Sequence, residues 1–465
     1  MAAGAEPAAT PPLRFEIATL TRLAGPIVLA NLSQMGMGAA DTIMAGRVSA
    51  AELAGVALGG NVYYPALLFI SGTILALTPT IAQLNGAGRS SEAGEVTRQA
   101  FWMALFGGIL LIFYLHNAAA ILRLLGVDPE AIPIADRYLT AISFGVVQVL
   151  CYFVLRYFCE GMSWTRPAMV LGIAGLLLKV PLNYLLIHGN DRLGIPALGG
   201  PGCGWSTATI VSLQCLTLLL IVARSHLRGT GLLDRFSTPD LRAISKLARL
   251  GLPIGVTNSL EVALFSGTTL LVGTLGVTAV ASHQIAMNIG GLAFMIPSAM
   301  GMAAAIRVGH NVGRRDYPGA RQSGWSALLV ALAFSAVAIA VMLMFGEFIT
   351  GLYSTDAAVV KTAAFLLLFV AGFQVFDAGQ VACMGSLRGY KDTRTPMLIA
   401  LFAYWLIGFP MAGALGLGWF GIPALGLSGF WIGLIGGLAI ASVLLLFRFR
   451  ALSNNPLSIA GLATH

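Results

Sequence analysis

Long apolar runs, separated by short segments rich in charged and turn-forming residues, dominate the pattern of this chain. The runs exceed the roughly 18 residues that a membrane-spanning helix needs. Spans are predicted near residues 18–42, 54–82, 100–121, 136–158, 167–189, 204–224, 250–271, 279–306, 324–346, 358–383, 397–416 and 426–447. The pattern therefore predicts an all-α membrane protein with twelve transmembrane helices.

Composition supports this class and excludes others. Of the 465 residues, 57% are hydrophobic and 10% are charged, whereas soluble domains carry about 25% charged residues. The net charge of +8 comes from basic residues dispersed among the loops, so it does not indicate binding to nucleic acid. The five cysteines lie within or beside apolar segments without metal-ligand spacing, which is typical of inert packing thiols.

Basic residues orient the predicted spans. Most Lys and Arg residues fall at one set of span ends, and the other set holds only Arg47, Arg123, Arg137, Arg192 and Lys361. Because short cytoplasmic loops carry the excess of Lys and Arg, both termini are expected in the cytoplasm. The expected location is the plasma (inner) membrane, which the chain crosses many times.

The chain is a tandem repeat. The hexapeptide 194–199 (GIPALG) recurs as 421–426, which is an offset of 227 residues, and Pro26-Ile27 recurs as Pro253-Ile254 at the same offset. Each half holds six predicted spans, and an even number keeps the two halves in the same orientation. We therefore expect two six-helix lobes related by a pseudo-twofold axis along the membrane normal, with substrate bound where the repeats meet.

The expected organisation follows from the repeat and from the polar segments. Its parts are a disordered N-terminal lead (1–13), an N-terminal lobe (14–225), a cytoplasmic interlobe loop (226–246), a C-terminal lobe (247–450) and a C-terminal tail (451–465).

Three carboxylates interrupt the apolar spans. Asp41, Glu261 and Asp377 lie at positions where a charge costs at least about 2.5–3.5 kcal/mol on insertion scales. Their counterparts at the repeat offset are not acidic, so the internal symmetry of the scaffold does not explain them. Intramembrane acids of this kind usually mark a path for an ion or a substrate.

Glu261 and Asp377 belong to the same half. Two carboxylates brought together in a low-dielectric site cannot both ionise cheaply, so a proton or a Na⁺ ion is expected to bind between them. The alternative is a structural pair with polar neighbours. Phe265, one turn after Glu261, and Phe373, one turn before Asp377, are expected to offer an aromatic wall to a drug cation.

Asp41 and Lys179 are the other charged residues inside predicted spans. Asp41 follows a run of small residues late in its span, where it serves function or is solvated near the outer interface. Lys179 lies thirteen residues past Arg166, which is roughly 20 Å along a helix. It either snorkels or pairs with an acid, or it is a built-in cation near Asp41 that competes with a proton or a substrate.

These residues resemble those of the multidrug and toxic compound extrusion (MATE) family, specifically its NorM-like branch. The resemblance covers essentially all twelve predicted spans. The matching segments are Gln34 to Gly46, Ala82 to Arg89, Pro181 to Tyr184, Pro253 to Glu261, His283 with Gln284, and Phe373 to Lys391. One departure is Lys179. The family motif in the fifth predicted span, 167–189, usually begins with Asn, and this chain has Lys179 there.

The resemblance implies a cation-coupled antiporter that exports large, often cationic, amphipathic drugs. It implies that Glu261 and Asp377 form the site of the coupling ion, with Na⁺ as the bound metal if sodium is the coupling ion. Asp41 is then tied to substrate binding or proton coupling, and Gln284 and Asp356 match positions of the drug pocket. No cofactor is implied, and the expected partners are small-molecule drugs, organic cations and the lipid bilayer around a functional monomer.

Two other classes of function compete. A flippase for a lipid-linked precursor needs a cavity rich in Arg or Lys to hold an anionic headgroup, but the spans hold three acids against one lysine. A membrane-embedded enzyme needs a nucleophile with a paired base, a phosphate-binding loop or a metal motif, and the sequence contains none of these patterns. The choice between Na⁺ and H⁺ stays open, because the same carboxylates serve both ions.

Overall fold

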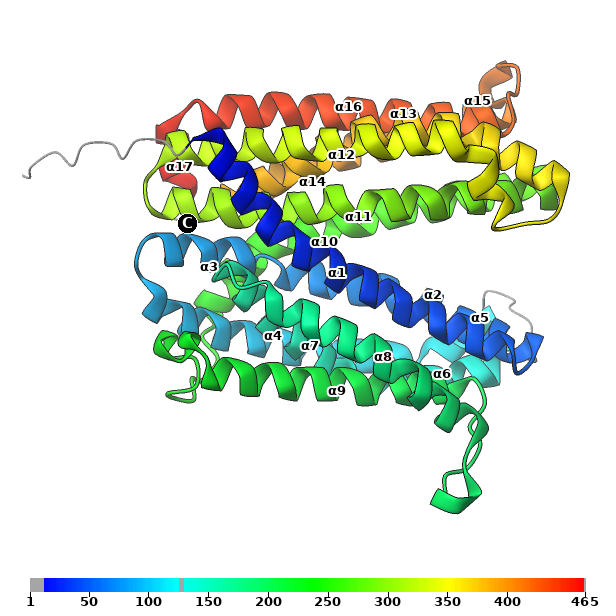
Figure 1. Cartoon of the computed structure of the whole chain (residues 1–465), viewed down its shortest axis with the longest axis horizontal. Helices are drawn as coiled ribbons and strands as arrows, with labels where there is room; N and C mark the ends of the chain where they lie inside the picture. The colour runs from blue at the N-terminus through cyan, green and yellow to red at the C-terminus, as the bar shows by residue number, and fades with distance from the viewer. Residues whose placement is uncertain (1–11, 125–128, 464–465) are drawn as a thin grey trace, which may run out of the picture. The chain divides into compact units, whose positions relative to one another are not determined.

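The computed structural model describes residues 12–124 and 129–463, and helices dominate both ranges. The chain divides into two compact units (Figure 1). We call Gly25–Gly255 the N-terminal unit, and Met1–Ala24 with Val256–His465 the C-terminal unit. The expected all-α fold is confirmed. The expected lead, 1–13, lies outside the described residues apart from its last two positions.

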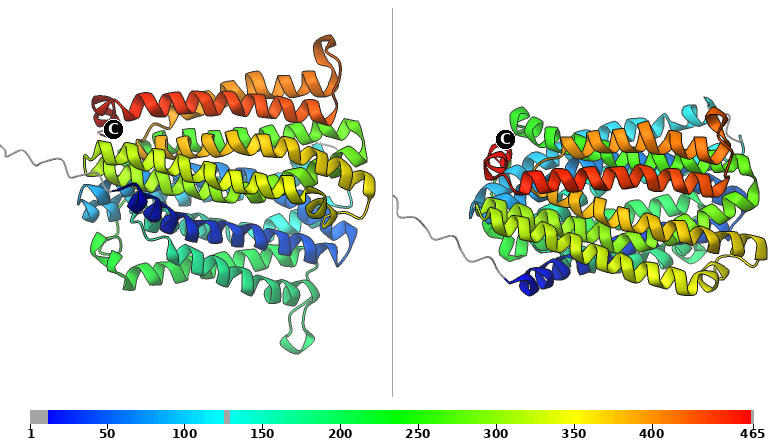
Figure 2. Two further views of the ribbon diagram at one scale, coloured as in Figure 1. Left: turned by 45° about the horizontal axis from the view of Figure 1, so that its top comes forward. Right: turned by 90° about the horizontal axis from the view of Figure 1, so that it is seen from above.

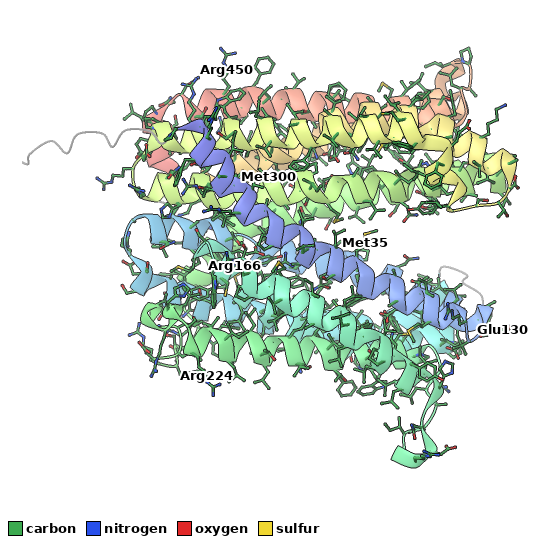
Figure 3. All side chains as sticks on the ribbon, viewed as in Figure 1. Met35, Glu130, Arg166, Arg224, Met300 and Arg450 are labelled. Atoms are coloured by element: carbon green, nitrogen blue, oxygen red, sulfur yellow. The ribbon has the colours of Figure 1, made fainter. Side chains whose placement is uncertain are left out.

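The N-terminal unit is a bundle in which α7 packs against both α4 and α9, and α6 and α8 also pack against α9. Its helices are α2 (Ala50–Ile74), α3 (Leu77–Gly86), α4 (Ser90–His116), α5 (Ala118–Leu124), α6 (Ile132–Ser143), α7 (Val146–Gly161), α8 (Arg166–His188) and α9 (Pro201–Arg224), with short 3₁₀ turns at Asp191–Leu193 and His226–Thr230. Arg166 and Arg224 lie at one end of this unit, and Glu130 lies at the other (Figure 3).

The C-terminal unit places α11, α12, α13 and α16 side by side (Figure 2). Its helices are α11 (Val277–Gly313), α12 (Tyr317–Gly351), α13 (Ala357–Gly389), α14 (Arg394–Ala400), a π-helical segment η4 (Leu401–Gly408), α15 (Phe409–Leu417), α16 (Leu427–Ser453) and α17 (Pro456–Ala463), with 3₁₀ turns at Gly273–Leu275 and Trp419–Gly421. Glycines bring α11 and α13 into close contact, because a Cβ atom added at Gly385 would overlap the backbone of Gly301.

Two long helices each begin in one unit and continue into the other. Helix α1 (Leu13–Gly46) enters the N-terminal unit at Gly25, and α10 (Leu241–Val272) enters the C-terminal unit at Val256. The compact units therefore do not share the limits of the expected lobes, 14–225 and 247–450. The segment expected as a loop, 226–246, is partly helical, since α10 already begins at Leu241.

Ten helices in the described residues are long and apolar enough to cross a membrane, and the bent pair α6 and α7, at 50°, makes eleven if it counts as one span. The remaining predicted span, 250–271, lies in α10, which is 32 residues long but does not meet this measure of length and hydropathy. Polar residues explain the shortfall, because Thr257, Asn258 and Glu261 interrupt its apolar run. The protein is accordingly a multi-span membrane protein.

The tandem repeat is visible in the backbone. Ser163 and Lys391 both adopt the left-handed conformation that non-glycine residues rarely use, with φ of 62° and 64°, directly after α7 and α13. The last glycines of the two hexapeptides, Gly199 and Gly426, also match, with φ of 63° and 60°. Equivalent turns therefore follow one pair of equivalent helices and precede another in the two halves, as a duplication requires.

The first turns of α1 are held in the C-terminal unit by a buried ion pair. The Glu16 carboxylate accepts two hydrogen bonds from the Arg307 guanidinium, at 2.9 and 2.7 Å, and one from the Ser323 hydroxyl at 2.5 Å. Glu16 is 1% exposed. Such two-pronged contacts are strong and directional, so they set where α1 starts.

We expect Glu16→Gln to destabilise the protein by about 1.5–3 kcal/mol, because the substitution removes a charged acceptor from a buried network. Thermal unfolding followed with a thiol-reactive dye measures the effect, since heating exposes the buried Cys383 of this unit. Arg14→Gln is the matched control, because Arg14 is exposed on the same helical turn. Equal stability of the two variants would contradict a role for the Glu16 pair.

Candidate functional site

The acids of the C-terminal unit lie close enough for their charges to interact. Glu261 is on α10 and is partly exposed, whereas Asp377 is on α13 and is 2% exposed. Among the residues that the structure describes, neither carboxylate has a hydrogen bond or an ion pair. Two acids in this state favour the binding of a cation or a proton, which offsets their like charges.

Polar groups surround the two acids. The Tyr404 hydroxyl, within electrostatic range of both, donates a hydrogen bond to the Gln380 side-chain oxygen. The Gln374 amide nitrogen donates to the Gly290 carbonyl at 2.9 Å, and its own side-chain oxygen is buried without a partner among the described residues. Because Gln374 is one turn before Asp377, that oxygen is a further candidate ligand for an ion.

Arg388 is a cation on the same helix as Asp377, and its charge acts on Glu261. Its guanidinium lies 3.3 Å from the Asn258 side-chain oxygen and 3.1 Å from the Met384 sulfur. Arg388 lies beyond the predicted span 358–383, but α13 continues to Gly389 and includes this residue, whose side chain is half-buried. The positive charge of Arg388 therefore acts on the acidic pair through Glu261.

The rings expected to form the aromatic wall are in contact with each other, and their expected part in drug binding stays a prediction. The Phe265 and Phe373 rings meet edge to face at 5.9 Å, and Phe373 meets Trp431 of α16 in the same way at 6.2 Å. His283 lies beside Trp431 with ring centroids 5.6 Å apart. Trp431 was missed from the sequence, because one aromatic residue in an apolar span carries no pattern that separates it from ordinary packing.

Gln284 and Asp356 have no described contact with this aromatic cluster. Gln284 is exposed on α11, whereas its neighbour His283 is buried. Asp356 is exposed and caps α13, where its carboxylate accepts from the backbone nitrogens of Ala358 at 2.8 Å and Val359 at 3.4 Å. Capping alone accounts for Asp356, and the expected part of both residues in drug binding stays a prediction.

Asp41 and Lys179 form a buried ion pair in the N-terminal unit. The Lys179 ammonium lies 2.8 Å from the Asp41 carboxylate, and the two side chains are 1% and 6% exposed. The hypothesis that Lys179 lies beside Asp41 is therefore confirmed as geometry. The Asn183 amide also donates to Asp41, at 2.8 Å. The expected part of Asp41 in drug binding stays a prediction.

A further buried ion pair of the N-terminal unit, Arg156 with Glu160, was not foreseen. Arg156 donates to the Glu160 carboxylate at 2.7 Å and to the Asn31 side-chain oxygen at 2.8 Å. The repeat held the signal: Asn31 is the counterpart of Asn258, and each asparagine accepts from an arginine near the C-terminal end of a helix, Arg156 of α7 and Arg388 of α13. The arginine of the C-terminal half, Arg388, stands about one helical turn beyond the position that the repeat offset assigns to Arg156.

The described residues contain no group of three or more His, Cys, Asp or Glu side chains placed to hold a metal ion. A coupling cation at Glu261 and Asp377 would therefore depend on neutral oxygen ligands as well as on carboxylates, which is the ligand chemistry of hard cations.

The MatE family model matches two segments of this chain, 26–185 and 253–413. The multidrug resistance protein MdtK of Yersinia pseudotuberculosis serotype O:1b (strain IP 31758) is 43% identical over 443 residues, which cover 95% of this chain and 96% of that protein. MdtK of Yersinia enterocolitica serotype O:8 / biotype 1B (strain NCTC 13174 / 8081) is 42% identical with the same coverage. The two matched segments are the two halves of the repeat.

Solved structures share the fold. The eukaryotic MATE transporter AtDTX14 superposes with a TM-score of 0.83 at 21% identity, covering 96% of this chain and 98% of that one. The Vibrio cholerae MATE transporter VcmN in the bent form gives a TM-score of 0.84 at 17% identity, with coverage of 96% and 98%. At these identities the likeness concerns the fold alone.

Proposed function

Because the chain belongs to the MatE family of membrane transporters, we propose that it exports amphipathic, often cationic, drugs from the cytoplasm in exchange for Na⁺ or H⁺. It is a transporter and not an enzyme. Its relatives named multidrug resistance protein support a broad range of substrates. The coupling to a cation rests on the residues of this chain.

One observation carries the proposal: the buried Asp377 lies within electrostatic range of Glu261, and neither acid has a hydrogen bond or ion pair among the described residues. In a medium of low dielectric constant, a proton or a Na⁺ ion stabilises such a pair. Gln374 and Tyr404 supply neutral oxygen atoms nearby. We therefore assign the coupling ion to Glu261 and Asp377.

The drug site is proposed at the rings of Phe265, Phe373 and Trp431. Aromatic faces attract organic cations and also contact apolar drug surfaces. Phe373 is one helical turn from Asp377. A drug bound at the aromatic rings and an ion bound at the acids would therefore contact the same stretch of α13. Competition between the two cations then gives antiport.

Coupling requires that the ion and the drug favour different conformations. An ion shifts a two-state equilibrium only by its difference in affinity for the two states, and a nearly complete switch takes about 5.5 kcal/mol. Bringing an ion to Glu261 and the buried Asp377 supplies a free energy of this kind, because like charges repel in the unliganded pair. Ion binding would thus reset the C-terminal unit after drug release.

The protein is proposed to act as a monomer in the inner membrane with both termini in the cytoplasm. The separation of Arg166 and Arg224 from Glu130 along the N-terminal unit (Figure 3) supports this orientation, since basic residues favour the cytoplasmic side. A lipid flippase is not favoured, because the site described at the aromatic wall is flanked by acids rather than by a basic cavity.

Ethidium efflux from proteoliposomes under an imposed Na⁺ gradient or an imposed pH gradient tests the proposal. We expect one of the two gradients to accelerate efflux above that of protein-free liposomes. The gradient that works identifies the coupling ion. Efflux that responds to neither gradient, for ethidium and for a second organic cation, would contradict cation-coupled drug export.

Phe373→Leu is expected to raise the apparent KM for ethidium by roughly 5- to 30-fold, because it removes an aromatic face that is worth about 1–2 kcal/mol to a desolvated cation. Leucine keeps the site apolar. Phe365→Leu is the matched control, since Phe365 is exposed on the same helix. If both variants shift KM equally, the wall formed by Phe373 does not contact the drug.

A further inference from the structure

A pocket lies at one end of the C-terminal unit, between the start of α12 and the place where α16 gives way to α17 (Figure 1). It has a volume of about 470 Å³. The residues that line it include Tyr317, Arg321 and Trp325 on one side, and Ser453, Asn454 and Pro456 on the other. None of the residues assigned above to ion or drug binding lines this pocket.

Both sides of the pocket lie at the edge of an apolar span. The predicted span 324–346 begins beside Trp325, and the predicted span 426–447 ends six residues before Ser453. Helix α12 has 35 residues, so it is about 52 Å long, whereas the hydrocarbon core of a bilayer is about 30 Å thick. The start of α12 therefore extends beyond the core, and the pocket lies at the depth of the lipid headgroups.

Exposed apolar side chains continue from the pocket along both helices. On α12, Leu329 and Leu332 follow Trp325 at helical spacing, and both are exposed. On α16, the exposed Phe447 and Val443 precede the pocket in the same way. This surface suits the acyl chains of a lipid whose headgroup occupies the pocket.

The Arg321 guanidinium supplies the charge of the pocket. Arg321 is exposed, and it has no ion pair among the residues that the structure describes. Two acids at this end of the unit are engaged elsewhere, because Asp316 accepts from the Gly319 backbone nitrogen at 2.9 Å and Asp392 accepts from Arg448 at 2.7 Å. A guanidinium without an acid partner is well suited to bind phosphate oxygens through paired hydrogen bonds.

Aromatic residues fix the shape of the pocket. Trp325 packs against Phe449 of α16 with ring centroids 5.3 Å apart, and a Cβ atom added at Gly324 would overlap the same phenylalanine ring. This contact holds the two helices together directly beside the pocket. Trp325 and Tyr317 are also of the residue types that are enriched at the level of lipid headgroups.

We propose that this pocket binds the phosphate group of an anionic phospholipid such as phosphatidylglycerol, and that Arg321 is the residue that binds the anion. A zwitterionic lipid carries a cationic group beside its phosphate, which Arg321 repels, so a lipid with a net negative charge is preferred. Under the orientation proposed above, the lipid belongs to the cytoplasmic leaflet, where anionic headgroups attract basic residues. The proposal does not rest on cation-coupled drug export.

A general attraction between basic residues and anionic lipids makes a different prediction. If only the total charge at this end of the unit matters, loss of any exposed arginine weakens lipid binding to the same extent. If the pocket recognises phosphate, loss of Arg321 has a much larger effect. Arg14→Gln is the matched control, because Arg14 is exposed in the same unit and does not line the pocket.

The experiment uses the full-length protein, freed of lipid, in a neutral detergent. Native mass spectrometry measures the Kd of the first bound dioleoyl phosphatidylglycerol for the wild type, Arg321→Gln and Arg14→Gln. Dioleoyl phosphatidylcholine is titrated in parallel, and glycerol phosphate and inorganic phosphate are added as competitors. Transport is not measured, so a failure of the proposed export function cannot affect the result.

We expect Arg321→Gln to raise the Kd for phosphatidylglycerol by roughly 10-fold or more, because it removes charge-assisted hydrogen bonds. Arg14→Gln should change that Kd by less than about twofold. The proposal is overturned if the two variants weaken binding equally, or if phosphatidylcholine binds the wild type as tightly as phosphatidylglycerol. Displacement of the lipid by glycerol phosphate or inorganic phosphate would also overturn it, because the site would then recognise a soluble phosphate.

Discussion

Asp377→Asn reduces gradient-driven ethidium efflux to the level of protein-free liposomes. Asparagine keeps the shape of the side chain but removes the charge, and the remaining Glu261 is then under the influence of Arg388 alone. A single carboxylate with a cation nearby no longer needs a proton or Na⁺ to offset like-charge repulsion. The coupling ion then binds the two conformations of the transporter equally well, so it no longer shifts the equilibrium between them, and the transport cycle stops.

The matched control is Glu347→Gln, which neutralises an exposed carboxylate on α12 of the same unit. It should leave efflux unchanged. Ethidium binding measured in detergent should persist in Asp377→Asn, because the aromatic wall is intact. Efflux by Asp377→Asn at half or more of the wild-type rate would show that the coupling ion binds elsewhere.

Arg156→Met is expected to destabilise the protein by about 3–5 kcal/mol, because it leaves the fully buried Glu160 carboxylate without its charged partner. For a unit of this size the unfolding temperature should fall by roughly 10 °C. A thiol-reactive dye reports the transition, since Cys159 is buried beside Glu160.

Removing both charges should restore most of this loss. In Arg156→Met combined with Glu160→Gln no buried charge is left unpaired, and such double replacements are often neutral. Arg166→Met serves as the control, because Arg166 is exposed at the start of α8. If Arg156→Met unfolds at the same temperature as Arg166→Met, the pair does not stabilise the fold.

The membrane class, the two lobes and the placement of the intramembrane charges could be predicted from the sequence, because each leaves a local signal. Apolar runs set the spans, and the repeated hexapeptide reveals the duplication. Asp41, Glu261 and Asp377 stand out because a charge in an apolar span is costly. Lys179 stood out for the same reason, but the sequence left open whether it snorkels or pairs with an acid, and the structure shows the pair with Asp41.

The rest depends on tertiary contacts that have no local signal. Glu160 and Arg156 lie near a predicted span end, where charges are ordinary, so their burial as a pair could not be read from the pattern. The π-helical segment Leu401–Gly408 is apolar throughout, and only the structure shows that it carries Tyr404 toward the acids. The crossing of α1 and α10 between compact units likewise depends on packing.

Drug-evoked cation flux is the most direct test of the central claim, that drug export is exchanged for a cation bound at Glu261 and Asp377. Proteoliposomes with an imposed ethidium gradient and no initial ion gradient are monitored for ²²Na⁺ movement and for a change of internal pH. The account predicts that one of the two ions moves opposite to the drug, and that Asp377→Asn abolishes this flux. Ethidium movement without counterflow of either ion would contradict it.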